Sequence, residues 1–253
     1  MKVFSLSRWT VGLSLALATV ATAEPIAVRV AEPPGHRALV LRTLDGKLLA
    51  QGDVTITVGD GRATSHVVFQ FTDGSVHDET AVFSQDDVFR LLSYRLMQKG
   101  PAFRSTLLMT LDTQTGRAVA RHSEGSGAEK VEEEMLAPSS DLANGIMVPM
   151  LKNLRPEIVS AAASWVAATP KPRQVKLAIS NAGAAPSPSA ASNRVIHYVV
   201  KAEIGGLEGL LAPLAGKQPP DTHVWIAEGA APAFVKSEGP LYVGGPVWRI
   251  EVP

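Results

Sequence analysis

Alternation of apolar and polar residues with a period of two is the sequence feature that most constrains the fold of this chain. The clearest case spans residues 196–204, whose apolar positions are Ile196, Tyr198, Val200, Ala202 and Ile204. The same pattern recurs in shorter segments at 54–58, 67–71, 107–111, 175–179 and 248–252. Successive side chains on a β-strand point to opposite faces, so each segment predicts a strand with one buried face.

Short turn signals separate several of these predicted strands. The clearest are Gly59-Asp60-Gly61, Asp73-Gly74 and the segment 113–116. Strands joined by such short turns pair antiparallel. The alternation of strands with long helices that would indicate a parallel α/β fold is not seen in the sequence. The segment 88–98 fits a strand nearly as well as a helix, and we assign it to a strand. We therefore expect a mainly-β fold, either a curved antiparallel sheet or a half-open β-barrel, with two short capping helices.

The first of these helices is predicted to begin at Asp141. Its apolar residues are spaced by four and share one helical face; they are Leu142, Ile146, Met150 and Leu154. Residues 139–141 offer N-cap side chains, and Pro149 is expected to kink or split the helix.

The second predicted helix spans residues 205–216. Its leucines follow the spacing i, i+3, i+4, i+7 and are Leu207, Leu210, Leu211 and Leu214. Gly216 is well placed as a C-terminal cap. Both helices are short and apolar on one side, so each is expected to cover a face of the sheet.

Residues 1–23 have the features of a secretory signal peptide. Lys2 and Arg8 precede an apolar stretch, and Ala21-Thr22-Ala23 supplies the small-x-small pattern for cleavage before Glu24. The alternative is a single membrane anchor, but the apolar stretch is shorter than the about 20 residues that a span needs. We expect residues 24–253 to form one domain, with a flexible loop at about 181–193.

Composition narrows the location and the class of partner. Lys plus Arg is 24 and Asp plus Glu is 24, so the net charge of zero argues against a nucleic-acid partner. Cysteine is absent, which excludes disulfides, thiolate metal sites, cysteine nucleophiles and a lipoprotein anchor. No second apolar run reaches the length of a transmembrane segment. We expect the mature chain in the periplasm or outside the cell.

No catalytic motif emerges from the sequence. The patterns GxSxG, HExxH and GxxxxGK[ST] are missing. His77-Asp78-Glu79 groups three types of metal ligand, but on a strand only His77 and Glu79 share a face, and a metal site needs three or four ligands. No pair of carboxylates is identified at the spacing of a glycosidase. We therefore predict no catalytic residue, no metal and no cofactor.

The segment 216–225 is the densest in chemically distinctive residues, with basic, acidic, imidazole and indole side chains around a Pro-Pro turn. On the strand that follows, Val224 and Ile226 would face the core. His223 and Trp225 would then share the other face, where a tryptophan can stack on a ligand or act as a packing contact. With the last strand and the second predicted helix added, the candidate ligand-binding residues are Trp225, His223, Lys217, Asp221, Trp248, Leu210 and Leu214.

Four segments together resemble a family of uncharacterised bacterial secreted proteins. They are 141–154, 169–177, 216–226 and 244–251. More distantly, the meander of long strands with a short capping helix is similar to the half-barrel of periplasmic lipoprotein-carrier-like proteins. This second resemblance implies a curved antiparallel sheet that holds a cavity and carries no catalytic residues.

These observations favour a non-enzymatic binding or carrier module for an apolar or amphipathic ligand such as a lipid. Two alternatives stay open: a hydrolase of the cell envelope, and a structural or assembly partner with a sealed core. A large apolar cavity would favour the carrier, and a cleft with facing carboxylates or a His–carboxylate pair would favour the hydrolase. A filled interior with an exposed apolar patch would favour the assembly partner.

The alternation at 196–204 makes a direct prediction about stability. Val200→Asp should lower the free energy of unfolding by several kcal/mol because it buries an unpaired charge, whereas Lys201→Asp should change it by about 0.5 kcal/mol or less. Urea denaturation of both variants measures the two values. Equal losses would show that the strand or its register is assigned wrongly.

Overall fold

The computed structural model describes residues 26–125, 127–186, 194–203 and 219–253. Within these ranges fourteen strands form one sheet. The first eight are β1 (Gly35–Thr43), β2 (Leu48–Gly59), β3 (Arg62–Phe71), β4 (Val76–Gln85), β5 (Phe89–Lys99), β6 (Thr106–Asp112), β7 (Arg117–Ser123) and β8 (Lys130–Met135). The last six are β9 (Ser160–Ala167), β10 (Arg173–Pro186), β11 (Arg194–Ala202), β12 (Thr222–Ala227), β13 (Ala233–Pro240) and β14 (Val247–Glu251).

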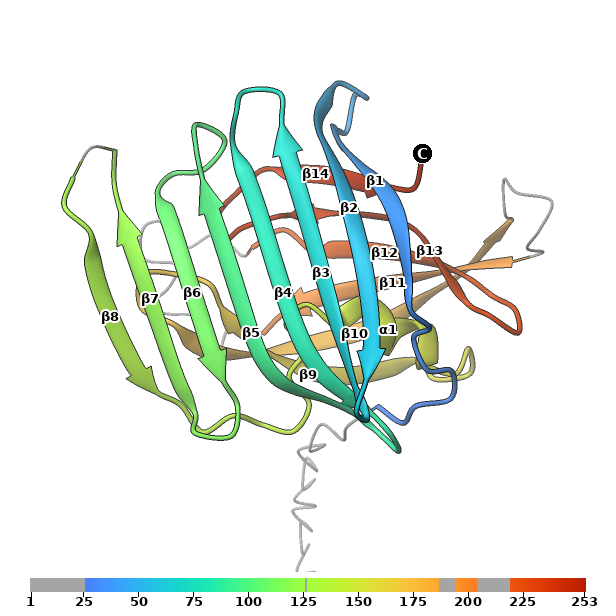
Figure 1. The fold of residues 1–253 in the computed structure, drawn as a ribbon. Helices are drawn as coiled ribbons and strands as arrows, with labels where there is room; N and C mark the ends of the chain where they lie inside the picture. Colours follow the sequence, from blue (N-terminus) through green and yellow to red (C-terminus); the bar gives the residue numbers. More distant parts are fainter. Residues whose placement is uncertain (1–25, 126, 187–193, 204–218) are drawn as a thin grey trace, which may run out of the picture.

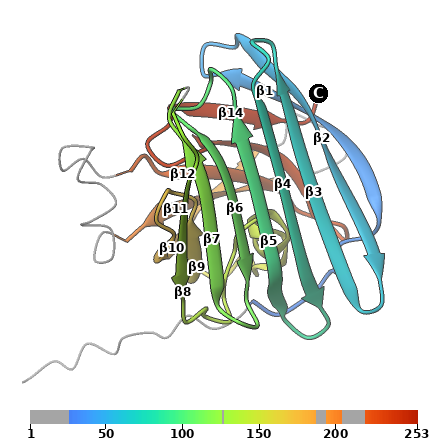
Figure 2. The ribbon, with the colours of Figure 1, turned by 60° about the vertical axis from the view of Figure 1, so that its left-hand side comes forward.

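The sheet is antiparallel throughout and folds over on itself. Its strand order is β8-β7-β6-β5-β4-β3-β2-β1-β14-β13-β12-β11-β10-β9. The front half-sheet, β1–β8, lies against the rear half-sheet, β9–β14, and the strands of one run across those of the other (Figure 1). Figure 2 shows the same two layers from the side. The prediction of a curved antiparallel sheet is confirmed; its two ends, β8 and β9, are not joined to each other.

The two half-sheets are joined by the pairing of β1 with β14. This register places Leu41 opposite Ile250 and Thr43 opposite Trp248. At this corner a cluster of aromatic and aliphatic side chains is buried between the layers; it consists of Leu39, Leu41, Ala50, Phe69, Phe71, Phe103 and Trp248. Gly52 has to be a glycine here, because a Cβ at this position would lie 2.4 Å from Cδ1 of Phe69. The bare backbone of β2 therefore lets the Phe69 ring lie across it.

A larger apolar cluster fills the space between the half-sheets. It contains side chains from β3–β7 and from β9–β12. In β11, Ile196, Tyr198 and Val200 are buried, whereas Lys201 is exposed and forms an ion pair with Asp221 at 3.2 Å. The predicted faces of this strand are therefore confirmed for these residues, and Ile204 lies outside the described residues. The assignment of 88–98 to a strand is also confirmed, as β5.

The predicted loop at 181–193 is wrong in its first part, because residues 181–186 belong to β10. The pairing of β10 with β11 shifts register between Asn181 and Ala184. Asn181 stabilises this irregularity by accepting a hydrogen bond from the Gly183 amide at 2.8 Å, and Gly183 has a φ of +105°. The small residues of this segment pair through their main-chain groups, with a glycine at the bulge. Composition alone does not reveal such pairing, so the segment was predicted to be a loop.

The helix α1 (Met147–Asn153) is shorter than the sequence predicts. The N-cap is Ile146, which makes no side-chain capping bond, so the predicted caps at 139–141 are wrong. Pro149 lies in the first turn, where an amide has no helical partner, and it neither kinks nor splits the helix. The chain reverses before the helix at Gly145, which has a φ of +67° and whose added Cβ would lie 2.6 Å from that of Ala81.

The predicted apolar residues before and within α1 are nevertheless all buried. They are Leu142, Ile146, Met150 and Leu154. Leu142 does not belong to the helix; it pairs with Ser164 of β9 in an isolated β-bridge. The second predicted helix, at 205–216, lies outside the described residues, as does the predicted cleavage site after Ala23. Among the residues that the structure describes, no helix is both long and apolar enough to span a membrane.

Residues 26–32, which we name the strap, connect the front half-sheet to α1. The Ile26 carbonyl accepts a hydrogen bond from the Phe89 amide at 3.1 Å, and Ile26 itself is buried. Asn153 holds the middle of the strap: its Oδ1 accepts from the amides of Arg29 (2.6 Å) and Val30 (2.7 Å). Its Nδ2 donates to the carbonyls of Val30 (3.0 Å) and Pro149 (2.9 Å). One buried amide side chain therefore fixes the strap against the helix.

Loss of this amide should be costly, because four hydrogen bonds disappear and main-chain groups stay buried without partners. We predict that Asn153→Ala lowers the free energy of unfolding by about 3 kcal/mol. Asn181→Ala is the matched control, since its side chain bonds only to exposed groups, and it should cost about 1 kcal/mol or less. Urea denaturation compares the two; similar losses would contradict a clamping role for Asn153.

Candidate functional site

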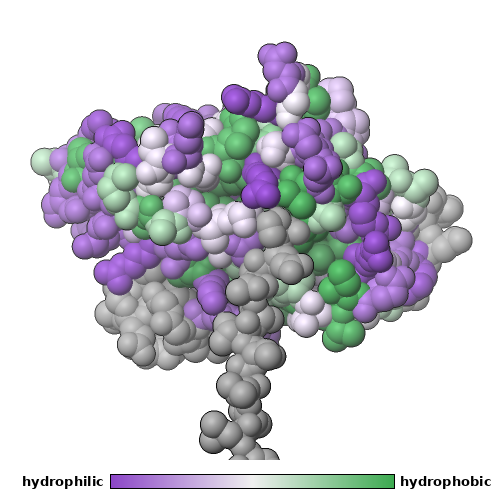
Figure 3. Space-filling model, turned by 90° about the horizontal axis from the view of Figure 1, so that it is seen from below, coloured by the Kyte–Doolittle hydropathy of each residue, from purple (hydrophilic) through white to green (hydrophobic). Residues whose placement is uncertain are grey.

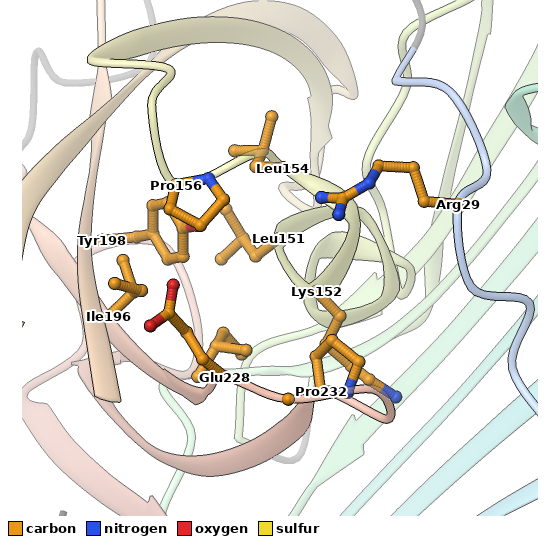
Figure 4. Close-up of a pocket in the computed structure, with 11 residues that line it drawn as sticks. Arg29, Leu151, Lys152, Leu154, Pro156, Ile196, Tyr198, Glu228 and Pro232 are labelled. Atoms are coloured by element: carbon orange, nitrogen blue, oxygen red, sulfur yellow. The ribbon is translucent and has the colours of Figure 1, made fainter. Parts of the chain in front are cut away.

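A cavity of about 90 Å³ opens where the strap, α1, β11 and the end of β12 meet (Figure 4). Its wall is apolar and buried, and it is formed by Leu151, Leu154, Ile196, Tyr198 and Ile226. Its rim carries the charged residues Arg29, Lys152 and Glu228. Figure 4 shows the Arg29 guanidinium and the Glu228 carboxylate reaching this space from different sides. The cavity therefore combines an apolar wall with charges of both signs at its entrance.

The local structure explains why these side chains meet. Period-two alternation turns Ile196 and Tyr198 of β11 inward, and the register places Ile196 opposite Ile226 of β12. The last turn of α1 supplies Leu151 and Lys152. The helix ends at Asn153, and its C-cap residue Leu154 has extended dihedral angles. Distant parts of the sequence thus supply each side of the cavity.

The rim charges differ in how they are satisfied. Lys152 Nζ lies 2.7 Å from Glu32 Oε1, and both side chains are only 11% exposed. Glu228 Oε2 lies 3.3 Å from Arg194 Nε. The guanidinium of Arg29 has neither an ion pair nor a hydrogen bond with any residue that the structure describes. Arg29 is therefore the rim group most available to an anionic ligand.

The pKa of Tyr198 depends on burial and on the charges around its hydroxyl. Burial raises the pKa of Tyr198, and the negative charge of Glu228 acts in the same direction, while Arg29 acts in the opposite one. The phenol is therefore neutral at physiological pH and can donate or accept a hydrogen bond at the cavity wall. The arrangement can bind a small amphipathic molecule, with its charged group at Arg29 and its apolar part on the buried wall.

Two of the residues predicted from the sequence lie on the opposite side of these same strands. Val224 and Ile226 are 2% and 3% exposed, so His223 and Trp225 do share the outer face of β12, as expected. Trp225 stacks parallel on His197 of β11 at a centroid distance of 4.4 Å, and Lys236 of β13 lies 4.1 Å from the indole centroid. Since the neighbours come from strands on either side, both faces of the indole are covered. Trp225 is thus no open platform for stacking a ligand.

The other predicted site residues that the structure describes, Trp248 and Asp221, do not line the cavity. Trp248 is buried in the corner between β1 and β14, where its ring lies 5.6 Å from that of Phe71. Asp221 pairs with Lys201 on the outer face. Lys217, Leu210 and Leu214 lie outside the residues that the structure describes.

Sequence reasoning missed the cavity for identifiable reasons. Ile196 and Tyr198 were assigned to the inner face correctly, but a buried face by itself does not reveal where packing is incomplete. Nothing in the sequence around Arg29 or Glu228 marks them as neighbours, because they are about two hundred positions apart. The Gly229 that follows Glu228, and the Pro156 that follows the helix, are turn signals at the entrance. These two residues could have indicated that loops lie here, but not that the two loops come together at one cavity.

Comparisons with protein-family models, with curated proteins and with solved structures find no match to this chain. In the part of the chain covered by the structure, no group of three or more His, Asp or Glu side chains is arranged to hold a metal ion. The function must therefore be argued from the geometry of the chain itself.

His77 and Glu79 share the inner face of β4, but each has its own partner. His77 Nδ1 lies 3.0 Å from Gln98 Nε2, whereas Glu79 Oε1 accepts a hydrogen bond from the Tyr94 hydroxyl at 2.6 Å. Burial raises the pKa of Glu79, and the Tyr94 hydrogen bond opposes that shift. Burial lowers the pKa of His77 from 6.5 to about 4, only partly opposed by the charge of Asp78. His77 is therefore a neutral core residue near pH 7.

This pKa makes stability depend on pH. Between about pH 6.5 and 4 the unfolded chain binds a proton at His77 that the folded protein does not, so the free energy of unfolding should fall as pH is lowered through this window. The loss from His77 should reach about 3 kcal/mol. His77→Gln should flatten this slope, as measured by urea denaturation at a series of pH values.

Phe69→Leu is the control, because the Phe69 ring lies beside His77 at 6.1 Å but carries no proton. This variant should be less stable at every pH and keep the slope of the parent protein. If His77→Gln keeps the slope as well, His77 is not the group that titrates.

Proposed function

We propose that the protein is a non-enzymatic binding module, exported to the periplasm or beyond, whose ligand is a small amphipathic carboxylate. The observation that supports this proposal best is the cavity itself, in which a buried apolar wall adjoins the Arg29 guanidinium. A guanidinium binds a carboxylate through two parallel hydrogen bonds. The apolar wall stabilises a bound ligand that buries a short hydrocarbon part against it. A carboxylate with such a hydrocarbon part combines both chemistries.

The volume of the cavity limits the size of the ligand. At about 90 Å³ it is smaller than the roughly 150 Å³ of an apolar cavity that holds benzene. Only a few heavy atoms can be enclosed, so a long acyl chain would have to leave most of its length outside. This argues for a short-chain ligand rather than a whole lipid, and it narrows the sequence-based expectation of an apolar or amphipathic ligand.

The assembly partner is a second candidate, and a different observation favours it. The space between the half-sheets is occupied by the large apolar cluster, and exposed apolar residues lie near the two ends of the sheet. Val131 and Met135 of β8 are 50% and 66% exposed, and Val159, just before β9, is 75% exposed. Seen from below, apolar residues are interspersed with hydrophilic ones rather than gathered into one broad patch (Figure 3). We therefore rank the assembly partner second.

The binding proposal predicts a ligand series. Straight-chain monocarboxylates of increasing length should stabilise the protein against urea, and the effect should level off once the hydrocarbon part exceeds the cavity. A ligand at one hundred times its dissociation constant adds about 2.7 kcal/mol. The primary amides of the same chain lengths should stabilise far less, because they lack the charge that Arg29 recognises.

Variants locate the binding. Arg29→Gln should abolish the difference between acids and amides, whereas Arg90→Gln, at an exposed arginine on β5, should preserve it. Equal stabilisation by acids and amides in the parent protein would refute a carboxylate ligand. No stabilisation by any member of the series would refute the binding module and favour the assembly partner.

A further inference from the structure

The outer face of β11 and β12 carries a pair of histidines with facing nitrogens. His197 Nε2 lies 2.8 Å from His223 Nδ1, and the ring centroids are 5.0 Å apart. With the centroids this far apart and the nitrogens this close, the rings meet nearly edge to edge, so the two facing nitrogens point at each other. This is the geometry of an N–H···N hydrogen bond between two imidazoles.

The sheet itself enforces this meeting. His197 is paired with Trp225 and His223 with Val199, so the two histidines are diagonal neighbours on one face of adjacent strands. Trp225 stacks on the His197 ring with an interplanar angle of 2°. Lys236 packs on the indole from the β13 side, with its Nζ 4.1 Å from the ring centroid. The two imidazoles are therefore kept next to each other before any ligand arrives.

Two imidazole nitrogens so placed are spaced like neighbouring ligands of a transition-metal ion. Metal–imidazole bonds of about 2.0 Å at a right angle place the two nitrogens about 2.8 Å apart. The facing nitrogen that carries the proton has to lose it while the other nitrogen of the same ring gains one. This change of tautomer leaves both rings neutral and frees both facing lone pairs. Each ring then has to turn by roughly 45°, so that its lone pair points at the ion instead of at the other nitrogen.

The number of ligands indicates which ion fits. No third His, Asp or Glu joins the pair to form a metal-binding group among the residues described. Glu238, which lies opposite His223 in the pairing of β12 with β13, is engaged by Lys236 at 3.0 Å and Arg249 at 2.8 Å. Zinc sites usually take three or four protein ligands, whereas Cu²⁺ accepts a tetragonal set of nitrogen and water ligands and binds most strongly in the divalent series.

We propose that His197 and His223 form a two-histidine site for Cu²⁺ on the outer face of the rear half-sheet. The site uses no residue of the cavity, so the tests of this proposal and of the proposed function are independent of each other. It also places the ion close to Trp225, because the indole stacks on one of its two ligands. A bound Cu²⁺ ion quenches the fluorescence of a nearby indole, so the chain contains its own reporter.

The test is a fluorescence titration of the full chain with Cu²⁺. The quenching should saturate at one ion per chain. Trp225→Phe should remove most of it, because Trp225 is the tryptophan that stacks on one of the two ligands, whereas Trp248 is buried in the corner cluster and Trp165 lies on β9. His223→Gln and His197→Gln should each weaken binding at least tenfold. His66→Gln is the matched control, because His66 lies on the front half-sheet beside Asp78, and it should bind Cu²⁺ like the parent protein.

Electron paramagnetic resonance of the parent protein with one equivalent of Cu²⁺ gives a second readout that does not depend on any variant. We expect hyperfine structure from two imidazole nitrogens, and its loss in whichever histidine variant retains its circular dichroism spectrum. Quenching that is unchanged in both histidine variants, or a spectrum without coupled imidazole nitrogens, would overturn the site.

Discussion

The pairing of β1 with β14 is the contact on which the rest of the structure depends. It joins strands from opposite ends of the chain and makes one sheet of two half-sheets. Its register brings Trp248 beside Phe71 at the inner corner, and this cluster holds the layers at a fixed separation. With the corner in place, the alternating apolar faces of both half-sheets can be buried only against each other.

The arrangement away from the β1–β14 corner is determined by the two free ends of the sheet, β8 and β9. The chain between β8 and β9 has to cross from one end to the other, and it places α1 in the space between the layers. The strap is then tied to α1 by Asn153. The cavity lies where these pieces meet, since a short helix, an irregular segment and two strand ends pack less completely than two regular sheet faces.

The faces of β11 and β12 separate two kinds of chemistry. Their inner face supplies the apolar wall of the cavity through Ile196 and Ile226, while their outer face carries His197, His223 and the Trp225 stack. One backbone element thus positions both proposed sites on opposite sides, and no side chain belongs to both. This separation follows directly from the two-residue period of a β-strand.

Local pattern in the sequence was sufficient to predict many of the strands, the antiparallel pairing through short turns, and the faces of Val200, Val224 and Trp225. The strands β1, β7, β8, β9 and β13 were not predicted. The predicted properties depend on residues within a few positions of each other, because alternation specifies which side of a strand is buried. The same pattern says nothing about which strand lies on the other side. The pairing of β1 with β14, the contact of Arg29 with a cavity formed by Ile196, and the edge-to-edge histidines were decided only by tertiary structure. Each of them brings together residues that the sequence keeps apart, and only the packing of the whole chain sets the distance between them.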